Sequence, residues 1–384
     1  MTDPAPIKPA PTNPFPPGVQ SGAHIALRLF DVAYAIDLAQ AEALWANHAG
    51  GSRWRTGLVA TLPKALSFEV APLQFPLGAV DVDIDGMACS CAAAATVYDF
   101  GVIAFSLRAE VGPVSWSDYA RGFHALDVAV GGDAPDAPVW TQLLDRVCSV
   151  IGAAFKRPAR RGVLQEDYLY AVVHALQEPL DAEQLQQRID IPALLSGEAR
   201  PLSAGERGEL MQRAFSYYAD DLVVLTWDRA FVHEPRRDPD VIGIVEVANA
   251  QLVQMRWYDE LLDDELPIMY DLVEHSRGGL LAPHRAARLA RKLYTLVAEV
   301  TELTERVDNA LQVTEDVYLA RVYGSALELF RVPRLGAAVD RKLGIIRDTY
   351  TALYDEASSR RTELLEVAIV LLIVFEIVLA LVRY

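Results

Sequence analysis

Hydrophobic and polar residues alternate differently in the two halves of the chain. The segment His24–Phe30 alternates apolar and polar side chains, as a strand with one buried face does. Residues 93–107 are apolar and rich in β-branched side chains, which favours buried strands, and residues 168–176 are predicted as another strand. Residues 140–155 have helical spacing. The pattern therefore predicts an α+β domain over residues 22–200.

Residues 201–358 have mostly helical spacing, so this region is predicted to be helical and in part a coiled coil. Ser203 and Glu206 form a capping-box pattern that opens a helix. Longer helices are expected over residues 285–330 and 335–358.

A heptad repeat lies in the helix predicted over residues 285–330. Its apolar residues follow a 4-3-4-3 spacing, which is the seam of a coiled coil. The spacing fits a hairpin within one chain and a contact between subunits equally well. The predicted seam consists of Leu289, Leu293, Leu296, Val300, Leu303 and Val307.

The strongest hydrophobic run is Leu364–Val382, in which 15 of 19 residues are Leu, Ile, Val or Phe. At about 1.5 Å per residue it measures roughly 28 Å, close to a hydrocarbon core of about 30 Å. Residues 359–384 are therefore predicted to form one C-terminal transmembrane anchor, which follows the α+β domain and the long antiparallel or coiled-coil helices. The expected partner is a membrane lipid bilayer.

Flanking charges predict the orientation of this anchor. Arg360 and Arg361 precede the run and Arg383 follows it. Because positive charges stay on the cytoplasmic side, and because a two-residue tail crosses more easily than the body, the N-terminus is expected in the cytoplasm. This predicts a tail-anchored, single-pass protein of the cytoplasmic inner membrane.

One carboxylate, Glu376, lies near the middle of the hydrophobic run. Such a group is either tolerated in a single helix or hydrogen-bonded across a helix–helix contact. We adopt the second alternative, with Leu372 and Leu379 beside Glu376 in the contact. It predicts a homo-oligomer.

Composition narrows the class of protein further. The formal charge of −17 disfavours a nucleic-acid backbone as a direct partner. Three cysteines in 384 residues suit a reducing compartment. The first 17 residues contain seven prolines and lack the pattern of a secretory signal, so residues 1–21 are expected to form a disordered tail with polyproline-II character.

Candidate chemistry is sparse. Asp81, Asp83, Asp85 and Gly86 have the spacing of the first half of a calcium loop, but Ala92 stands where the bidentate Glu belongs. A strand with solvated carboxylates explains the same spacing. The chain lacks the usual phosphate, dinucleotide, zinc-protease and nucleophile-elbow motifs. The sequence therefore predicts no cofactor, no metal and no enzyme.

Two basic clusters stand out against the acidic background. They are predicted either as solvated faces that neutralise nearby acids or as contacts with anionic lipid or ribosomal RNA. The clusters are Lys156, Arg157, Arg160 and Arg161, and Arg285, Arg288, Arg291 and Lys292.

The run Tyr98-Asp99-Phe100-Gly101, together with the sequences 303–309 and 316–323, resembles the YagE / Rmd-type family of proteins required for meiotic nuclear division. Val367 stands where that family usually has a Trp. The resemblance implies a membrane-anchored protein without established enzymatic activity. Mitochondrial relatives in that family form high-mass homo-oligomers and support organellar translation.

These features together predict a non-enzymatic, membrane-anchored, oligomeric scaffold or tether. A first alternative is a membrane-attached enzyme that uses Asp81, Asp83 and Asp99. A second is a membrane tether that associates with ribosomes or RNA through the basic clusters.

Overall fold

A computed structural model describes most of the chain. The described residues are 16–48, 66–67, 71–84, 86–132, 137–158, 164–198, 200–276, 288, 291, 294–295, 297–298, 300–301, 312–313 and 316–382. The chain divides into two compact units, of which the first comprises residues 1–254 and 309–332 and the second residues 255–308 and 333–384.

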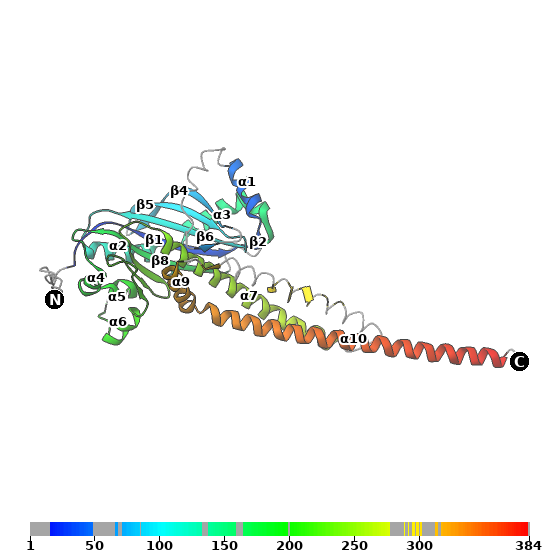
Figure 1. Ribbon diagram of the computed structural model, residues 1–384. Coiled ribbons are helices and arrows are strands. Elements are labelled where there is room, and N and C mark those ends of the chain that lie inside the picture. The colour runs from blue at the N-terminus through cyan, green and yellow to red at the C-terminus, as the bar shows by residue number, and fades with distance from the viewer. Residues whose placement is uncertain are drawn as a thin grey trace. The chain divides into compact units, whose positions relative to one another are not determined.

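A mixed sheet of eight strands organises the first unit (Figure 1). Its strand order is β4-β5-β6-β1-β8-β11-β10-β9, and every neighbouring pair is antiparallel except β8 and β11. The strands are β1 Val19–Asp31, β4 Leu73–Ile84, β5 Met87–Val97, β6 Val102–Val111, β8 Gln165–Leu176, β9 Ala214–Phe215, β10 Leu222–Leu225 and β11 Arg229–His233. Two short pairs join β2 Ala33–Ile36 to β7 Phe155–Pro158, and β3 Leu66–Ser67 to β12 Gln312–Val313.

Strand β1 lies inside the sheet, with β6 on one side and β8 on the other. Ile25 is opposite Arg108 of β6 and Tyr170 of β8. Almost every residue of β1 is buried, because its two edges are paired and its two faces are covered. The strand predicted over His24–Phe30 is confirmed, and it is longer than predicted.

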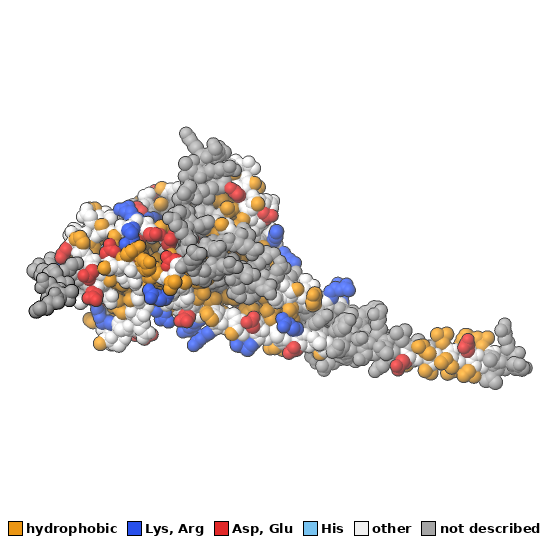
Figure 2. All heavy atoms as spheres, viewed as in Figure 1, with side chains coloured by type: hydrophobic (Ala, Val, Ile, Leu, Met, Phe, Trp, Pro, Cys, Tyr) orange, Lys and Arg blue, Asp and Glu red, His pale blue; other side chains and the backbone are white. Residues whose placement is uncertain are grey.

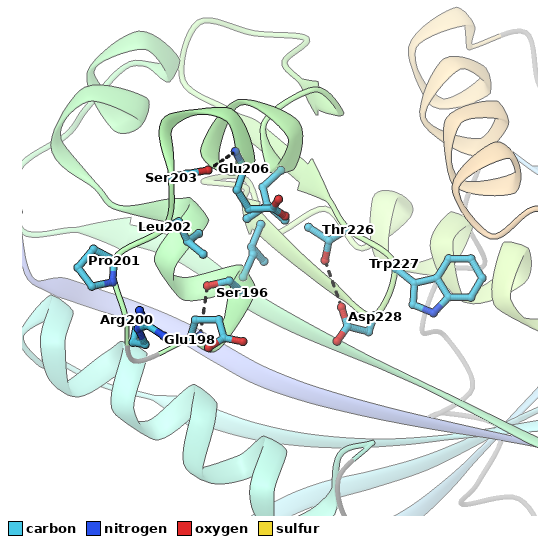
Figure 3. Close-up of a pocket in the computed structure, with 12 residues that line it drawn as sticks. Ser196, Glu198, Arg200, Pro201, Leu202, Ser203, Glu206, Thr226, Trp227 and Asp228 are labelled. Atoms are coloured by element: carbon cyan, nitrogen blue, oxygen red, sulfur yellow. Dashed lines mark hydrogen bonds between the residues drawn. The ribbon is translucent and has the colours of Figure 1, made fainter.

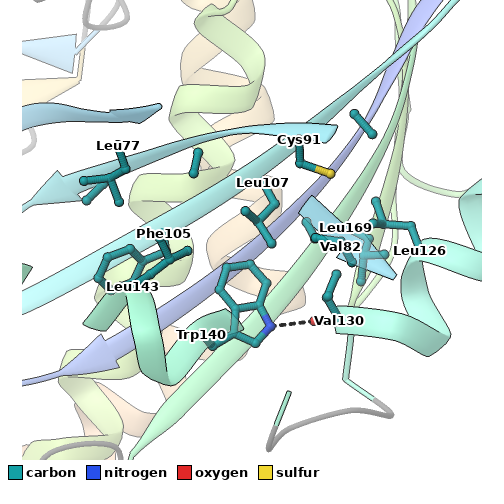
Figure 4. Close-up of a cluster of buried hydrophobic side chains, with 14 of the residues drawn as sticks. Leu77, Val82, Cys91, Phe105, Leu107, Leu126, Val130, Trp140, Leu143 and Leu169 are labelled. Atoms are coloured by element: carbon teal, nitrogen blue, oxygen red, sulfur yellow. Dashed lines mark hydrogen bonds between the residues drawn. The ribbon is translucent and has the colours of Figure 1, made fainter. Parts of the chain in front are cut away.

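One face of the sheet packs against helices α1 (Leu38–His48), α2 (Trp116–Val130) and α3 (Pro138–Ile151), and together they enclose a hydrophobic core. Side chains alternate along β8, so Leu169 and Ala171 belong to this core. Figure 4 shows the indole of Trp140 beneath the strands, and its Nε1 donates to the carbonyl of Val130 at 2.8 Å. The short helices on the chain after β8 are α4 Ala182–Arg188, α5 Ile191–Ser196 and α6 Ala204–Leu210, and the turn η1 Gly152–Ala154 follows α3.

The other face is covered by the first part of helix α7 (Asp240–Ser276) and by α9 (Val317–Leu329). The hydroxyl of Tyr170 donates to the carbonyl of Ile242 at 3.3 Å, and the ring of Tyr168 meets that of Phe330 edge-on at 5.5 Å. The sheet is therefore the middle of three layers in this unit.

A buried arginine connects β1 to the end of α2. The Arg28 guanidinium donates to the carbonyls of Val130 and Gly131 at 3.3 and 2.6 Å and lies 5.7 Å from the ring of Trp140. A cation is favourable at this place, because the last carbonyls of a helix lack intrahelical partners. Arg28 thus supplies a donor to the Gly131 carbonyl and a second donor, beside Trp140, to the Val130 carbonyl.

The second unit contains the end of α7 and the long helix α10 (Val332–Val382). Lys342 Nζ donates to the carboxylates of Asp259 and Asp263 at 2.6 and 2.7 Å, so α10 and α7 lie side by side there. The buried residues of the two helices recur at intervals of three, four and seven, as in a coiled coil. They are Tyr258, Leu262 and Met269 of α7, and Val339, Leu343 and Ile346 of α10.

This seam differs from the one predicted by the heptad repeat. Val300 is the one predicted seam residue among the described positions, and it is buried. The others lie outside the described residues, namely Leu289, Leu293, Leu296, Leu303 and Val307.

The predicted fold class is wrong in two respects. First, the sheet extends into the region predicted to be helical, because β9, β10 and β11 lie between residues 214 and 233. Each of these strands has only two to five residues, too few to show a clear two-residue period, and β11 is recruited through its parallel pairing with β8.

Second, no helix in the described part of the chain combines the length and the apolar character that a membrane crossing requires. The predicted transmembrane anchor, its single-pass topology and the inner-membrane location are therefore wrong. The apolar run of α10 contains two carboxylates, Glu366 and Glu376, and a carboxylate inside a hydrocarbon core is costly.

Gly101 offers a test of the packing between the β5–β6 turn and the short strand β2. Its φ is +93°, and a Cβ built there would collide with the carbonyl of Ala33. We expect Gly101→Ala to lower the free energy of unfolding by at least about 2 kcal/mol in urea denaturation. Gly112 is exposed and has open space around its Cα, so Gly112→Ala is the matched control. Equal effects of the two substitutions would contradict the assignment.

Candidate functional site

The three carboxylates of the predicted enzymatic alternative do not form one site. Asp81 and Asp83 are exposed on β4, opposite Ser90 and Ala88 of β5, whereas Asp99 lies in the turn after β5. The nine residues from Ser90 to Asp99 measure about 30 Å along an extended strand. The structure therefore separates Asp99 from the other two.

The calcium-like spacing has a structural explanation instead. Strand β4 is the edge strand of the sheet among the described residues, and charged side chains on an edge strand discourage pairing with other chains. Gly86 has φ +79° in the turn between β4 and β5, the conformation that a tight hairpin requires. In the described residues no cluster of three His, Cys, Asp or Glu side chains is arranged to hold a metal.

The run Tyr98-Asp99-Phe100-Gly101 serves to build the turn between β5 and β6. Tyr98 and Phe100 are buried and stacked with ring centroids 5.1 Å apart. The carbonyls of Asp99 and Gly101 accept hydrogen bonds from the backbone N–H groups of Ile36 and Val32. The run is therefore explained by packing of the turn.

A buried polar cluster lies between the sheet and α7. The hydroxyl of Tyr98 donates to Glu246 Oε1 at 3.1 Å, and Thr96 is a second hydrogen-bond partner of this carboxylate. Burial raises the pKa of Glu246 and outweighs the two hydrogen bonds, which lower it. Sequence reasoning missed this cluster. A signal was present, because Glu246 interrupts an otherwise apolar stretch of α7.

A further hydrogen bond ties α7 to α9. The hydroxyl of Tyr323 donates to Gln251 Oε1 at 2.6 Å, and both residues are buried. The interior beneath α7 therefore contains hydrogen-bonded polar groups among its apolar side chains.

A shallow, open hollow of about 630 Å³ lies beside α5, α6 and the turn between β10 and β11 (Figure 3). Ser203 caps α6 by accepting from the Glu206 N–H, and Thr226 Oγ1 contacts Asp228. Its lining contains neither His nor Cys, so it has no Ser–His or Cys–His pair for nucleophilic catalysis. The lining residues are Leu195, Ser196, Glu198, Arg200, Pro201, Leu202, Ser203, Glu206, Leu210, Thr226, Trp227 and Asp228.

The C-terminal apolar segment, residues 367–379 of α10, is the largest group of exposed hydrophobic side chains in the described chain. Figure 2 shows these side chains together near the end of α10, with acidic side chains between them. Glu376 is exposed among them. The exposed fractions of 43–64% belong to Val367, Ile369, Val370, Leu371, Leu372, Ile373, Val374, Phe375, Ile377, Val378 and Leu379.

The basic residues singled out in the sequence are only partly described. Lys156 and Arg157 are exposed in β7, and the Arg157 guanidinium lies 4.9 Å from the ring of Tyr34. Arg288 and Arg291 are exposed. Outside the described residues or side chains lie Arg160, Arg161, Arg285, Lys292, Arg360, Arg361 and Arg383.

The structure defines an α+β protein. It contains an eight-stranded mixed sheet with helices on both faces, and a pair of long helices, α7 and α10. Residues 21–240 match the family described as "Uncharacterized protein MJ0711, N-terminal domain", and the chain belongs to this family. The matched range covers the eight strands of the sheet, apart from the first two residues of β1, and ends as α7 begins.

A curated relative is the "Uncharacterized protein MJ0711" of Methanocaldococcus jannaschii, which is 26% identical over 176 residues. The alignment covers 46% of this chain and 53% of the relative, so the chain spans about half of that protein's length. No solved structure matches the chain.

The resemblance to the YagE / Rmd-type family is wrong, because the matching family is a different one. The reason is local. The Tyr-Asp-Phe-Gly run forms a turn that contains two buried rings and one residue with positive φ. Turns with the same requirements occur in unrelated sheets, so the run does not identify a family.

A pH-dependent contribution to stability is expected from His24. It packs on Tyr119 and Phe123 of α2, and burial together with the nearby His124 lowers its pKa to about 4. A lowered pKa gives stability that is complete above the unfolded value of about 6.5 and is lost as the pH falls towards 4. We expect His24→Gln to reduce the loss of unfolding free energy between about pH 7.5 and pH 5 by about 2 kcal/mol. An unchanged loss in urea titrations would contradict this.

Glu246 is expected to act in the opposite direction. Its raised pKa gives stability that is complete below the unfolded value of about 4.5 and is lost as the pH rises through the folded pKa. The difference in unfolding free energy between Glu246→Gln and the unmodified protein should therefore favour the variant more at about pH 8 than at about pH 5. Tyr98→Phe is the control, since it removes a donor to the carboxylate and should cost more at the higher pH. A difference independent of pH would contradict the assignment.

Proposed function

We propose that this protein is a non-enzymatic scaffold that assembles with copies of itself through the C-terminal apolar segment. The observation that supports this proposal is the exposure of that segment over consecutive residues 369–379. A helix that is apolar on every side is normally buried, and a large exposed apolar patch usually marks a contact with another molecule.

The free energy available to such a contact is substantial. Each large aliphatic side chain transferred completely from water contributes about 1.5–3 kcal/mol. Ten such side chains and the ring of Phe375, between Val367 and Leu379, are about half exposed. A symmetric contact between two copies buries this segment from each copy. The buried apolar area therefore doubles, and no second apolar segment is needed.

Glu376 is proposed to fix the register of the assembled helices. A single polar residue in an apolar helix contact lowers the stability of the contact but selects one register and one subunit number, because it must meet a hydrogen-bond partner. Leu372 and Leu379 lie one turn on either side of Glu376, on the same face of α10.

The separation of Asp81 and Asp83 from Asp99 argues against the enzymatic alternative. The absence of a nucleophile–base pair among the residues that line the described hollow points in the same direction. Both observations support a binding role more than a catalytic one.

If the protein self-assembles through the C-terminal apolar segment, the mass of the assembled particle should fall when that segment is made polar. In Leu372→Glu/Leu379→Glu, like charges enter the apolar contact and must be desolvated, so we expect the oligomer to dissociate into monomers. The measurement is light scattering coupled to size exclusion on the full chain. The matched control is Met87→Glu, at an exposed apolar residue of the first unit. A monomeric unmodified protein, or an unchanged mass of the double variant, would disprove the proposal.

The substitution Glu376→Leu tests whether Glu376 sets the register of the assembled helices rather than the strength of their contact. Without the polar residue we expect assembly to persist, with a different or heterogeneous subunit number in the same scattering measurement. An unchanged, uniform mass would remove the role assigned to Glu376.

A further inference from the structure

An aromatic patch lies on the first unit, where the chain approaches β10 and where α9 begins. We define it as Phe215, Tyr217, Tyr218, Val317 and Tyr318. Tyr217, Tyr218 and Val317 are 61%, 51% and 81% exposed. The exposed ring of Tyr217 lies 4.7 Å from that of Tyr218 and 5.3 Å from the buried ring of Tyr318, which supports it.

The patch is held in shape by a buried carboxylate. Asp221 accepts hydrogen bonds from the backbone N–H groups of Tyr217 and Tyr218, at 2.7 and 3.2 Å, and from Arg236 at 3.0 Å. The Arg236 guanidinium in turn lies 4.0 Å from the centre of the Tyr218 ring. A surface fixed in this way loses little conformational entropy when it binds a partner.

Carboxylates outnumber cations around the patch, where the Arg321 guanidinium lies 6.0 Å from the Phe215 ring and 5.8 Å from the Tyr318 ring. Arg236 is already paired with the carboxylates of Asp220, Asp221 and Glu234. Asp316 is exposed beside Val317. The surroundings therefore favour a ligand that carries a positive charge and no negative one.

We propose that the patch binds the proline-rich segment of the same chain, residues 4–17. This segment contains seven prolines and one cation, Lys8, with no acidic residue. Proline-rich segments bind surfaces lined with aromatic rings, because their polyproline-II conformation is preformed and costs little entropy to fix. Residues 4–15 themselves lie outside the described residues.

The chain path brings the base of this segment close to the patch. Pro17 and Gly18 are buried, and the Gly18 carbonyl accepts from the Gln177 N–H at 2.9 Å. Five residues later Ala182 donates to the carbonyl of Ala219, which follows Tyr218 directly. Five residues span at most about 18 Å, whereas residues 4–17 in polyproline II extend about 40 Å. The segment is therefore long enough to cross the patch.

Photo-crosslinking on the full chain tests this proposal. Tyr218 is replaced by p-benzoylphenylalanine, which retains an aromatic ring, and the cross-linked peptides are identified by mass spectrometry after illumination. We expect cross-links into residues 1–28. The control replaces Val128, which is 67% exposed on α2, and should give no such cross-links.

Isotope mixing shows which copy supplies the segment. When unlabelled and ¹⁵N-labelled chains are mixed before illumination, cross-links within one chain join only peptides of the same label. Peptide pairs of mixed label, cross-links to other regions, or no cross-links would overturn the proposal.

A second variant tests the chemistry of the contact. Pro9→Ala/Pro11→Ala/Pro14→Ala removes three prolines without touching the sheet, so the fold should be unchanged by circular dichroism. We expect the cross-link yield from position 218 to fall at least about fivefold, because the preformed polyproline-II conformation is lost. An unchanged yield would overturn the proposed recognition.

Discussion

The two-sided pairing of β1 is the constraint on which the first unit depends. Residues 22–30 of β1 form antiparallel ladders with both β6 and β8, so a slip of one residue would exchange the two faces of the strand in both ladders. Arg28 would then leave the carbonyls at the end of α2, and His24 would leave Tyr119. The register of β1, the position of α2 and the burial of the Arg28 charge therefore depend on one another.

Polar groups lie on both faces of the sheet, and different kinds of interaction stabilise them. The Arg28 guanidinium is surrounded by helix-end carbonyls and an indole ring. On the other face, burial favours the neutral form of Glu246 against the hydrogen bonds of Tyr98 and Thr96. His24, which packs on α2 and has a lowered pKa, and Glu246 of α7, which has a raised pKa, therefore give the two helix layers pH responses of opposite direction.

Much of the first unit was predictable because its elements are long enough to show a period. The helix predicted over residues 140–155 is confirmed as α3 followed by a short turn, the strand over 168–176 as part of β8, and the cap at Ser203 as the start of α6. The strands β9–β11 were not predictable, because short strands take their conformation from a neighbour. In the Glu246 cluster, residues about 150 positions apart in the sequence are hydrogen-bonded, and a local sequence pattern cannot predict such a contact.

The sequence by itself determined that the chain begins with a mixed α+β domain, that long helices follow, and that residues 367–379 are uninterrupted apart from Glu376 in their apolar character. These properties depend on local spacing and composition. Only the tertiary structure decided that the helical seam pairs α7 with α10, that Asp81 and Asp83 lie far along the hairpin from Asp99, and that the ring of Tyr217 packs against those of Tyr218 and Tyr318. Those facts depend on which distant segments meet, and that choice is made by burial and pairing over the whole sheet.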